Sequence, residues 1–237
     1  MIDEILAEIR HALTESSDDQ WQESARRYFK EEIRLYGVPN ATVHRIARQY
    51  FKKFKGLTKA EIFAVGEELF KSDYSEEAYV AAEWAYAIRN QYQAEDFEIF
   101  KGWLFKYINS WAKCDTLCNH TIGSFVEQYP EYVEKLKGWA RDENRWVRRG
   151  AAVTLVLPAR KGMFLEDVFE IAEILLTDED DLVRKGYGWM LKEASRQHQP
   201  EVFDFIVRHR KVMPRTALRY AIEKMPEDLR REAMKKE

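Results

Sequence analysis

Residues 147–150 read Val147-Arg148-Arg149-Gly150, and the same pattern returns 36 residues later as Val183-Arg184-Lys185-Gly186. Each copy follows an acidic stretch, Asp142-Glu143 in the first case and Asp178 to Asp181 in the second. Apolar residues in both regions recur at the three- and four-residue spacing of an α-helix. Because the connections are short, consecutive helices are expected to pack as antiparallel pairs, and the repeated pattern predicts an array of such pairs.

An acidic turn followed by Val-Arg at the start of a helix is typical of HEAT-like repeats. In such repeats each helix pair buries its apolar face against the neighbouring pairs. We therefore predict an all-α fold, a right-handed solenoid of antiparallel helix pairs with about fourteen helices and a concave binding face. The sequence contains no evident linker, so residues 1–237 are predicted to form a single domain.

Several individual helices can be placed from their apolar stripes. One is expected from Trp21 to Ile33, another starts at a capping box in Thr58–Glu61, and a third runs from Trp111 to near Tyr129. Four tryptophans fit these stripes and are predicted to lie in the core. They are Trp21, Trp84, Trp103 and Trp139.

The composition excludes several classes of protein. Hydrophobic residues make up 46% of the 237 residues and charged residues 33%, which fits many amphipathic helices around a substantial core. Ten glycines and six prolines are too few for an all-β protein with many turns. The formal net charge of −3 argues against a basic footprint over the whole protein, although the local distribution of charge decides what binds.

Cysteine usage and hydropathy indicate a cytoplasmic protein of a bacterial-type, reducing cytosol. Cys114 and Cys118 lie one helical turn apart and give no disulfide framework. The first residues form an acidic amphipathic segment rather than a signal peptide, and no run of 18 apolar residues predicts a membrane span. A metal shared by Cys114, Cys118 and His120 lacks a fourth ligand at a sensible spacing, so we predict no metal and no cofactor.

Positive charge gathers in residues 141–161, where six Lys or Arg residues are opposed by only two acids. Lys185 and Lys192 fall on the next inner helix. Inner helices of adjacent repeats line one face, so these charges are expected to merge into a basic groove. The alternative is that an arginine such as Arg148 pairs with the acidic turns between repeats, whereas Arg149 and Lys185 point elsewhere on their helices.

Trp111 and Asp115 lie four residues apart, which puts an indole and a carboxylate on one helix face. Together with Arg149 and Trp189 they supply one acid, one guanidinium and two indoles from three helices, a set that suits a cationic ligand. Each indole taken alone also fits the core. An indole exposed in a groove loses burial and therefore needs a ligand packed on it.

Five segments of the chain resemble the AlkD family of alkylpurine DNA glycosylases. The resemblance covers essentially the whole chain in register, with the motifs in the right order and at similar spacing. The segments are Ala25–Lys30, Ser110–Asp115, Trp146–Ala152, Gly188–Glu193 and Pro214–Ala217.

The resemblance implies a HEAT-like solenoid that holds duplex DNA in its concave face and hydrolytically releases cationic N3- or N7-alkylated purines. By position, Asp115 matches the family's catalytic carboxylate, and Trp111 and Trp189 match two indoles that lie against the deoxyribose and backbone of the lesion. Arg149 matches a phosphate-contacting arginine, and Tyr28 matches a tyrosine near the lesion. The other expected DNA contacts, from the basic groove, are Arg148, Lys185 and Lys192.

A lone carboxylate suits this substrate chemically. Breaking an N-glycosidic bond creates an oxocarbenium-like sugar, which a fixed carboxylate stabilises while it orients the attacking water. A purine alkylated at N3 or N7 already carries a positive charge and departs neutral, so no acid has to protonate it. The sequence offers no clear second acid partnered with Asp115, which predicts poor activity on uncharged lesions.

The expected partner is therefore duplex DNA containing alkylated purines, bound at the nucleoid by a monomer with no obligate protein partner and no membrane association. The resemblance implies recognition through the DNA backbone without a pocket for a flipped base, a point that the sequence leaves open. Two alternatives remain. One is a HEAT-like scaffold with Trp111 and Trp189 as anchors for a protein partner, and the other is a catalytically silent DNA-binding protein of the same fold.

Overall fold

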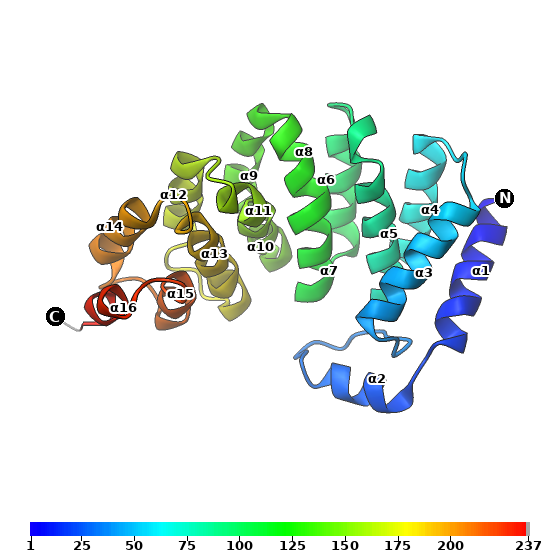
Figure 1. Ribbon diagram of the computed structural model, residues 1–237, viewed down its shortest axis with the longest axis horizontal. Helices are drawn as coiled ribbons and strands as arrows, with labels where there is room; N and C mark the ends of the chain where they lie inside the picture. The colour runs from blue at the N-terminus through cyan, green and yellow to red at the C-terminus, as the bar shows by residue number, and fades with distance from the viewer. Residues whose placement is uncertain (236–237) are drawn as a thin grey trace. The chain divides into compact units, whose positions relative to one another are not determined.

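The computed structural model describes residues 1–235 of this protein. Their regular secondary structure is helical (Figure 1). No β-strand occurs among these residues, and an isolated bridge joins Arg34 and Tyr74. The predicted all-α class is confirmed. Contacts between Cα atoms divide the chain into two compact units, Met1–Leu117 (unit 1) and Cys118–Glu237 (unit 2), and the single domain stays a prediction.

Unit 1 consists of helix pairs in two rows. Its helices are α1 (Ile2–Glu15), α2 (Asp19–Arg26), α3 (Asn40–Lys53), α4 (Lys59–Lys71), α5 (Ser75–Ala87), η1 (Arg89–Gln91), α6 (Asp96–Tyr107) and α7 (Trp111–Thr116). Helices α3, α5 and α7 pack side by side in one row, and α1, α4 and α6 form the other. The helix α2 buries none of its residues, so it stands apart from both rows.

Unit 2 repeats this arrangement. Its helices are η2 (Leu117–Ile122, begun by the last residue of unit 1), α8 (Gly123–Gln128), η3 (Pro130–Tyr132), α9 (Val133–Trp139), α10 (Arg145–Thr154), α11 (Val156–Arg160), α12 (Leu165–Ile174), α13 (Asp181–Ala194), α14 (Gln199–His209), α15 (Arg215–Ala221) and α16 (Glu227–Ala233). Helices α10, α13 and α15 pack in one row, with α9 and α12 behind them.

Two local predictions are confirmed. The capping box at the start of α4 is present, because the Thr58 hydroxyl accepts from the Glu61 N–H and the Glu61 carboxylate accepts from the Thr58 N–H at 2.8 Å. The helix expected from Trp111 to near Tyr129 is also present, with the π-helical η2 between α7 and α8. Residues 1–235 contain sixteen α-helical segments. Counting α7 and α8 as one interrupted helix, and α10 and α11 as another, gives the predicted fourteen.

The helix predicted from Trp21 to Ile33 is wrong in its second half, because α2 ends at Arg26. Residues 27–39, which we call the strap, run without a regular helix from α2 to α3. Gly37 adopts a φ of +88°, and a Cβ at this position would lie 2.6 Å from the Gln22 Cβ. The strap still buries Ile33, Leu35 and Val38, so its apolar residues are buried without forming a helix.

The core contains three of the four tryptophans predicted for it. Trp84, Trp103 and Trp139 are buried, and the Trp84 indole N–H donates to the Ala47 carbonyl at 2.8 Å. The prediction for Trp21 is wrong, since its side chain is 43% exposed. Its helix, α2, has no apolar face turned to a core. Trp21 is therefore available to a ligand.

Close approach of α13 and α15 depends on Gly188. A Cβ there would lie 2.7 Å from the Tyr220 Cβ and 2.8 Å from the Ala217 carbonyl oxygen. We expect Gly188→Ala to lower the free energy of unfolding by about 1–3 kcal/mol, because the two helices must separate. Gly138→Ala is the matched control: its Cβ meets nothing within 4 Å, so an alanine in the last turn of α9 is expected to raise the free energy of unfolding by at most about 1 kcal/mol. Urea unfolding measures both, and equal stabilities would contradict the prediction.

None of the helices in residues 1–235 combines the length and hydrophobicity that a membrane span requires.

Candidate functional site

Unit 1 carries a cleft of about 490 Å³, a volume in the range of small-molecule binding sites. Its walls come from α2, the strap, α3, α5 and α7. Aromatic and acidic side chains face it, and none of the described residues that line it is Lys or Arg. We call it the aromatic cleft. Its aromatic residues are Trp21, Tyr28, Phe29, Tyr79 and Trp111, and its acids are Glu76 and Asp115.

Trp111 forms a fixed wall of the aromatic cleft. Its indole stacks on the Phe29 ring, with centroids 5.1 Å apart and planes inclined by 15°. Its N–H donates to the backbone carbonyl of Tyr28 at 3.3 Å. Both contacts join α7 to the strap, 82 and 83 residues earlier in the chain. The indole is therefore held from two sides while its side chain remains only half-buried.

The start of α7 is anchored by a buried ammonium group. Lys113 is 2% exposed, and its Nζ donates to the Asp73 carbonyl at 2.7 Å, to the Asp73 carboxylate at 2.6 Å and to the Asn109 side chain at 3.0 Å. Burial lowers the pKa of Lys113, and the Asp73 carboxylate opposes that shift. Ser110 caps the same turn by accepting from the Lys113 N–H. These bonds fix the helix that carries Trp111 and Asp115.

Asp115 lies half-buried in the aromatic cleft, close to Tyr79. Burial raises the pKa of Tyr79, and the negative charges of Glu76 and Asp115 raise it further. The phenol therefore keeps its proton at neutral pH and can act as a hydrogen-bond donor in the cleft. A carboxylate held near aromatic rings favours positive charge in the space between them.

The second acid of the cleft, Glu76, holds the strap in place through hydrogen bonds to its backbone. It is 2% exposed, and its Oε1 accepts from the backbone N–H groups of Gly37 at 2.9 Å and Val38 at 3.1 Å. Its Oε2 accepts from the Tyr36 N–H at 3.1 Å. The adjacent Glu77 accepts from the Tyr36 hydroxyl at 2.7 Å. Both oxygens of Glu76 are thus engaged by the backbone, so its role is to shape the cleft.

The predicted site residues of unit 2 have their own environments. Arg149 is 5% exposed, donates to the Leu182 carbonyl, and lies 3.4 Å from the position that a Cβ on Gly186 would take. Trp189 is half-buried on α13. Lys185 pairs with Asp181 at 2.8 Å within the same helix. Lys192 pairs with Glu223 at 3.1 Å and lies 5.8 Å from the Tyr220 ring centroid.

Arg148 makes contacts within and between helical repeats. Its Nε donates to the Asp178 carboxylate at 2.6 Å, and its Nη1 donates to the carbonyls of Asp142 and Glu143 at 2.9 and 2.8 Å. Arg184, at the equivalent place in the second copy of the repeat, donates to the Asp178 carbonyl. The guanidinium groups thereby tie the acidic turns to the helices that follow them. A role of Arg148 in binding DNA stays a prediction.

Of the predicted site residues, Tyr28, Trp111 and Asp115 line one cleft of unit 1. Four further residues of that cleft were not predicted from the sequence. Phe29 and Trp21 were assigned to a helix stripe, and Tyr79 and Glu76 lie in α5, whose apolar pattern drew attention to its core residues. A signal for Glu76 was present, since two adjacent acids open a segment that is otherwise rich in alanine. The four cleft residues that were not predicted are Trp21, Phe29, Glu76 and Tyr79.

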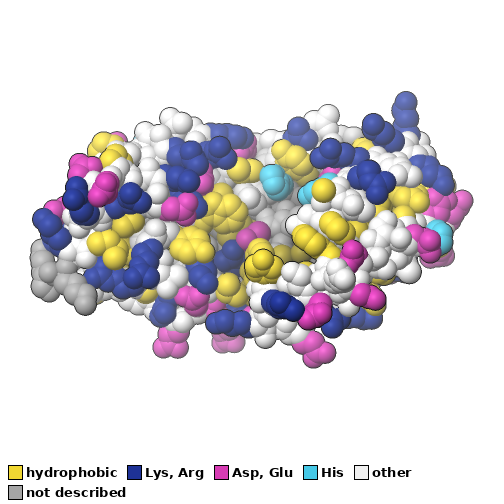
Figure 2. Space-filling view, turned by 60° about the horizontal axis from the view of Figure 1, so that its bottom comes forward, with side chains coloured by type: hydrophobic (Ala, Val, Ile, Leu, Met, Phe, Trp, Pro, Cys, Tyr) yellow, Lys and Arg dark blue, Asp and Glu magenta, His cyan; other side chains and the backbone are white. Residues whose placement is uncertain are grey.

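The structure groups no three His, Cys, Asp or Glu side chains of residues 1–235 in a way that could hold a metal ion. Cys114 and Cys118 are buried and form no disulfide. On the face seen in Figure 2, Lys and Arg side chains are interspersed with Asp and Glu.

Comparison with known proteins gives a family and, among solved structures, relatives of similar fold. A sequence model described as DNA alkylation repair enzyme matches residues 9–225. A predicted DNA alkylation repair enzyme from Enterococcus faecalis has a TM-score of 0.79 at 18% sequence identity. The match covers 90% of this chain and 98% of the Enterococcus chain. Pseudomonas fluorescens alkylpurine DNA glycosylase AlkC, bound to DNA containing an abasic site analogue, has a TM-score of 0.51 at 14% identity, covering 98% of this chain and 65% of its own. These likenesses concern the fold, and a search of curated proteins gave no match.

Proposed function

Because the chain belongs to the DNA alkylation repair enzyme family, we propose that it is an alkylpurine DNA glycosylase, of the AlkD type, acting on duplex DNA. Its reaction is hydrolysis of the N-glycosidic bond of purines alkylated at N3 or N7. The observation that carries this proposal is the aromatic cleft, which combines five aromatic rings and two carboxylates with no Lys or Arg among its described lining residues. Alkylation at N3 or N7 makes a purine cationic, and such a cleft favours cations.

The aromatic walls supply part of the selectivity. The face of an indole or phenol attracts a nearby cation by about 0.5–2 kcal/mol, depending on how far water is excluded. Trp111 is held by its stack on Phe29 and by its bond to the Tyr28 carbonyl, so little side-chain entropy is lost on binding. Tyr28 is 75% exposed and Trp21 43% exposed, which leaves both free to pack against a nucleotide.

Asp115 is the group assigned to chemistry. Its carboxylate stabilises the oxocarbenium-like deoxyribose that develops as the bond breaks, and it orients the water that attacks C1′. The departing purine leaves as a neutral base and takes no proton from the protein. Glu76 does not supply one, since both of its oxygens accept backbone N–H groups. Because Asp115 is the one carboxylate assigned to the reaction, the substrate is limited to bases that already carry a positive charge.

The residues of unit 2 are proposed as contacts to the DNA backbone. Trp189 is assigned to the deoxyribose beside the lesion, and Arg149 to a phosphate. A phosphate contact by Arg149 requires its guanidinium to turn outward from the Leu182 carbonyl. Lys185 and Lys192 each have one carboxylate partner in the structure, as Arg148 does. Phosphates compete with those carboxylates for the same cations.

The proposed function is tested by base release from three duplexes, one containing 7-methylguanine, one hypoxanthine and one undamaged guanine. We expect release of 7-methylguanine alone, because hypoxanthine is a neutral base that needs protonation to leave. Binding to each duplex is measured in parallel. Binding without release of 7-methylguanine identifies a catalytically silent DNA-binding protein, and absence of duplex binding identifies a scaffold for another partner. Both results contradict the proposal.

A further inference from the structure

A strongly basic segment begins in the strap and includes the whole of α3. Between Ile33 and Ala60 the chain carries seven Lys or Arg residues and no Asp or Glu. This is unusual in a chain of net charge −3 that contains 41 acidic residues. Lys53 and Lys59 pair with Glu8 and Asp96, and the remaining cations of a segment without acids favour contact with negative charge.

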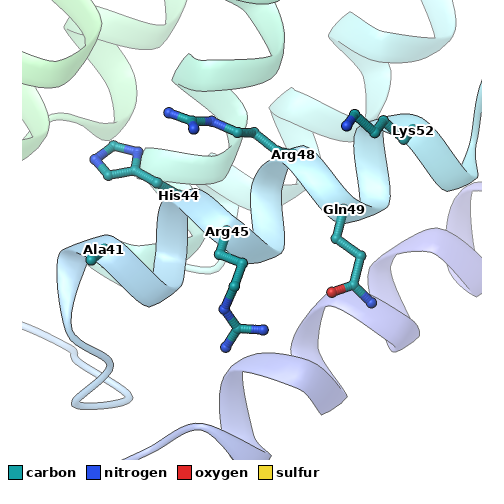
Figure 3. Close-up of a pocket in the computed structure, with 6 residues that line it drawn as sticks. All are labelled: Ala41, His44, Arg45, Arg48, Gln49 and Lys52. Atoms are coloured by element: carbon teal, nitrogen blue, oxygen red, sulfur yellow. The ribbon is translucent and has the colours of Figure 1, made fainter.

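The exposed part of α3 carries three of these cations, Arg45, Arg48 and Lys52, together with His44 (Figure 3). His44, Arg48 and Lys52 follow one side of the helix, one turn apart, and Arg45 projects from the other side with Gln49. An open hollow of about 490 Å³ lies along them. We call His44, Arg45, Arg48 and Lys52 the α3 basic face. From His44 to Lys52 the array is about 12 Å long, from the rise of 1.5 Å per residue.

The α3 basic face retains an excess of positive charge. Glu83 is the carboxylate that reaches it, bonding His44 at 2.6 Å and Arg48 at 3.3 Å. Within residues 1–235 no carboxylate lies within ion-pair distance of Arg45 or Lys52. Both side chains are exposed or half-exposed on a helix without acids. Their charge is not used to stabilise the fold.

The α3 basic face is continuous with the aromatic cleft. His44 lines both the cleft and the hollow along α3, and Asn40, at the start of the same helix, lines the cleft. Both lie within unit 1. The cleft favours a cation and repels phosphates, because it contains two carboxylates and no Lys or Arg among its described residues. A cationic base in DNA is flanked by phosphates, which need positive charge beside the cleft rather than in it.

We propose that the α3 basic face binds the phosphodiester backbone of the DNA strand that leaves the aromatic cleft. This inference rests on the proposed function and extends it, by assigning the strand's phosphates to residues of unit 1 that the resemblance does not include. Arg48 and Lys52 lie one helical turn apart and Arg45 lies on the other side of the same exposed helix, so the face can meet more than one phosphate of an approaching strand. An acidic protein segment is the competing occupant, and it does not account for the neighbouring cleft.

The test is the salt dependence of duplex binding. The observed association constant of a protein that neutralises phosphates falls with salt, with a log–log slope of about −0.9 per phosphate. We compare the wild-type protein with the double variant Arg45→Gln/Lys52→Gln on a duplex containing 7-methylguanine. The slope of the double variant is expected to be shallower by about 1.8, and its affinity at low salt is expected to fall by at least about tenfold. Circular dichroism checks that the variant is folded.

A second double variant, Lys101→Gln/Lys106→Gln, is the matched control. It also removes two exposed or half-exposed cations of unit 1, but from α6, which lies in the other row of helices. Its slope and affinity are expected to equal those of the wild type. A change in slope of the same size in both variants would show that general charge is responsible and would overturn the proposal.

The outcomes separate this inference from the proposed function. If the wild type binds duplex DNA and releases 7-methylguanine, but Arg45→Gln/Lys52→Gln leaves the salt slope unchanged, the proposed function stands and the α3 basic face is not a backbone contact. If the wild type binds no duplex, both are wrong. Binding of poly-glutamate that is tighter than binding of DNA, and that is lost in the double variant, would assign the face to an acidic protein partner.

Discussion

Base release by the variant Asp115→Asn is expected to be about 10²–10³-fold slower than by the wild type, on the scale of losing one preorganised electrostatic group at a reacting centre. Asparagine has nearly the same shape and keeps one oxygen, but it lacks the negative charge that stabilises the oxocarbenium-like sugar. Duplex affinity should change little, because Asp115 lies in the cleft and contributes no attraction to phosphates. Single-turnover release of 7-methylguanine at saturating protein measures the chemical step separately from binding.

The control for this variant is Asp3→Asn, which makes the same change at an exposed position in the first turn of α1. It should release 7-methylguanine at the wild-type rate. Undiminished release by Asp115→Asn would remove Asp115 from the mechanism, even if the protein is an active glycosylase. A loss of duplex binding equal to the loss of rate would show instead that Asp115 organises the cleft.

Unit 1 is expected to lose about 3 kcal/mol of stability in the variant Glu76→Ala, because three backbone N–H groups of the strap then lack their acceptor. Two of these donors, on Gly37 and Val38, belong to buried residues. The strap should open more often, and faster hydrogen exchange of the amides of residues 36–38 should report this. Urea unfolding followed by tryptophan fluorescence measures the stability.

A second substitution makes the test more specific. Glu76→Gln keeps an oxygen for Gly37 and Val38 but turns an NH₂ group toward the N–H of Tyr36. The free energy of unfolding should therefore fall by less, about 1–2 kcal/mol. The surface control is Glu68→Ala, which breaks a pair with Lys71 that is nearly half exposed on both sides and should cost at most about 0.5 kcal/mol. Equal stability of Glu76→Ala and Glu68→Ala would exclude the proposed role of Glu76.

Features set by neighbouring residues could be predicted from the sequence. The all-α class follows from apolar spacing that persists through most of the chain, and the capping box at Thr58 depends on two residues three positions apart. The helix that starts at Trp111 has its own cap at Ser110. In each case the energy that decides the structure acts within one or two turns, so the local pattern is sufficient.

Features that depend on distant residues could not be predicted in this way. The strap is bonded to distant residues: Glu76 accepts N–H groups about 40 positions earlier, and Trp111 donates to the Tyr28 carbonyl. No local sequence pattern reports these contacts. Trp21 fits an apolar stripe, yet the helix to which it belongs has no core to face. The spacing of Trp111 and Asp115 predicts that they share one helix face, whereas Tyr28 joins their site through the family resemblance alone. The contacts that join α7 to the strap were not predicted.

Both cysteines are buried, which bears on how the folded chain would react with alkylating agents. Agents that methylate purines also react with soft nucleophiles, and a thiolate on a protein surface is among the softest. Cys114 and Cys118 are the chain's two thiols, and each is 0% exposed. An alkylating agent therefore finds no exposed sulfhydryl group on the folded chain, and a protein with the proposed function would resist the reagents that create its proposed substrate.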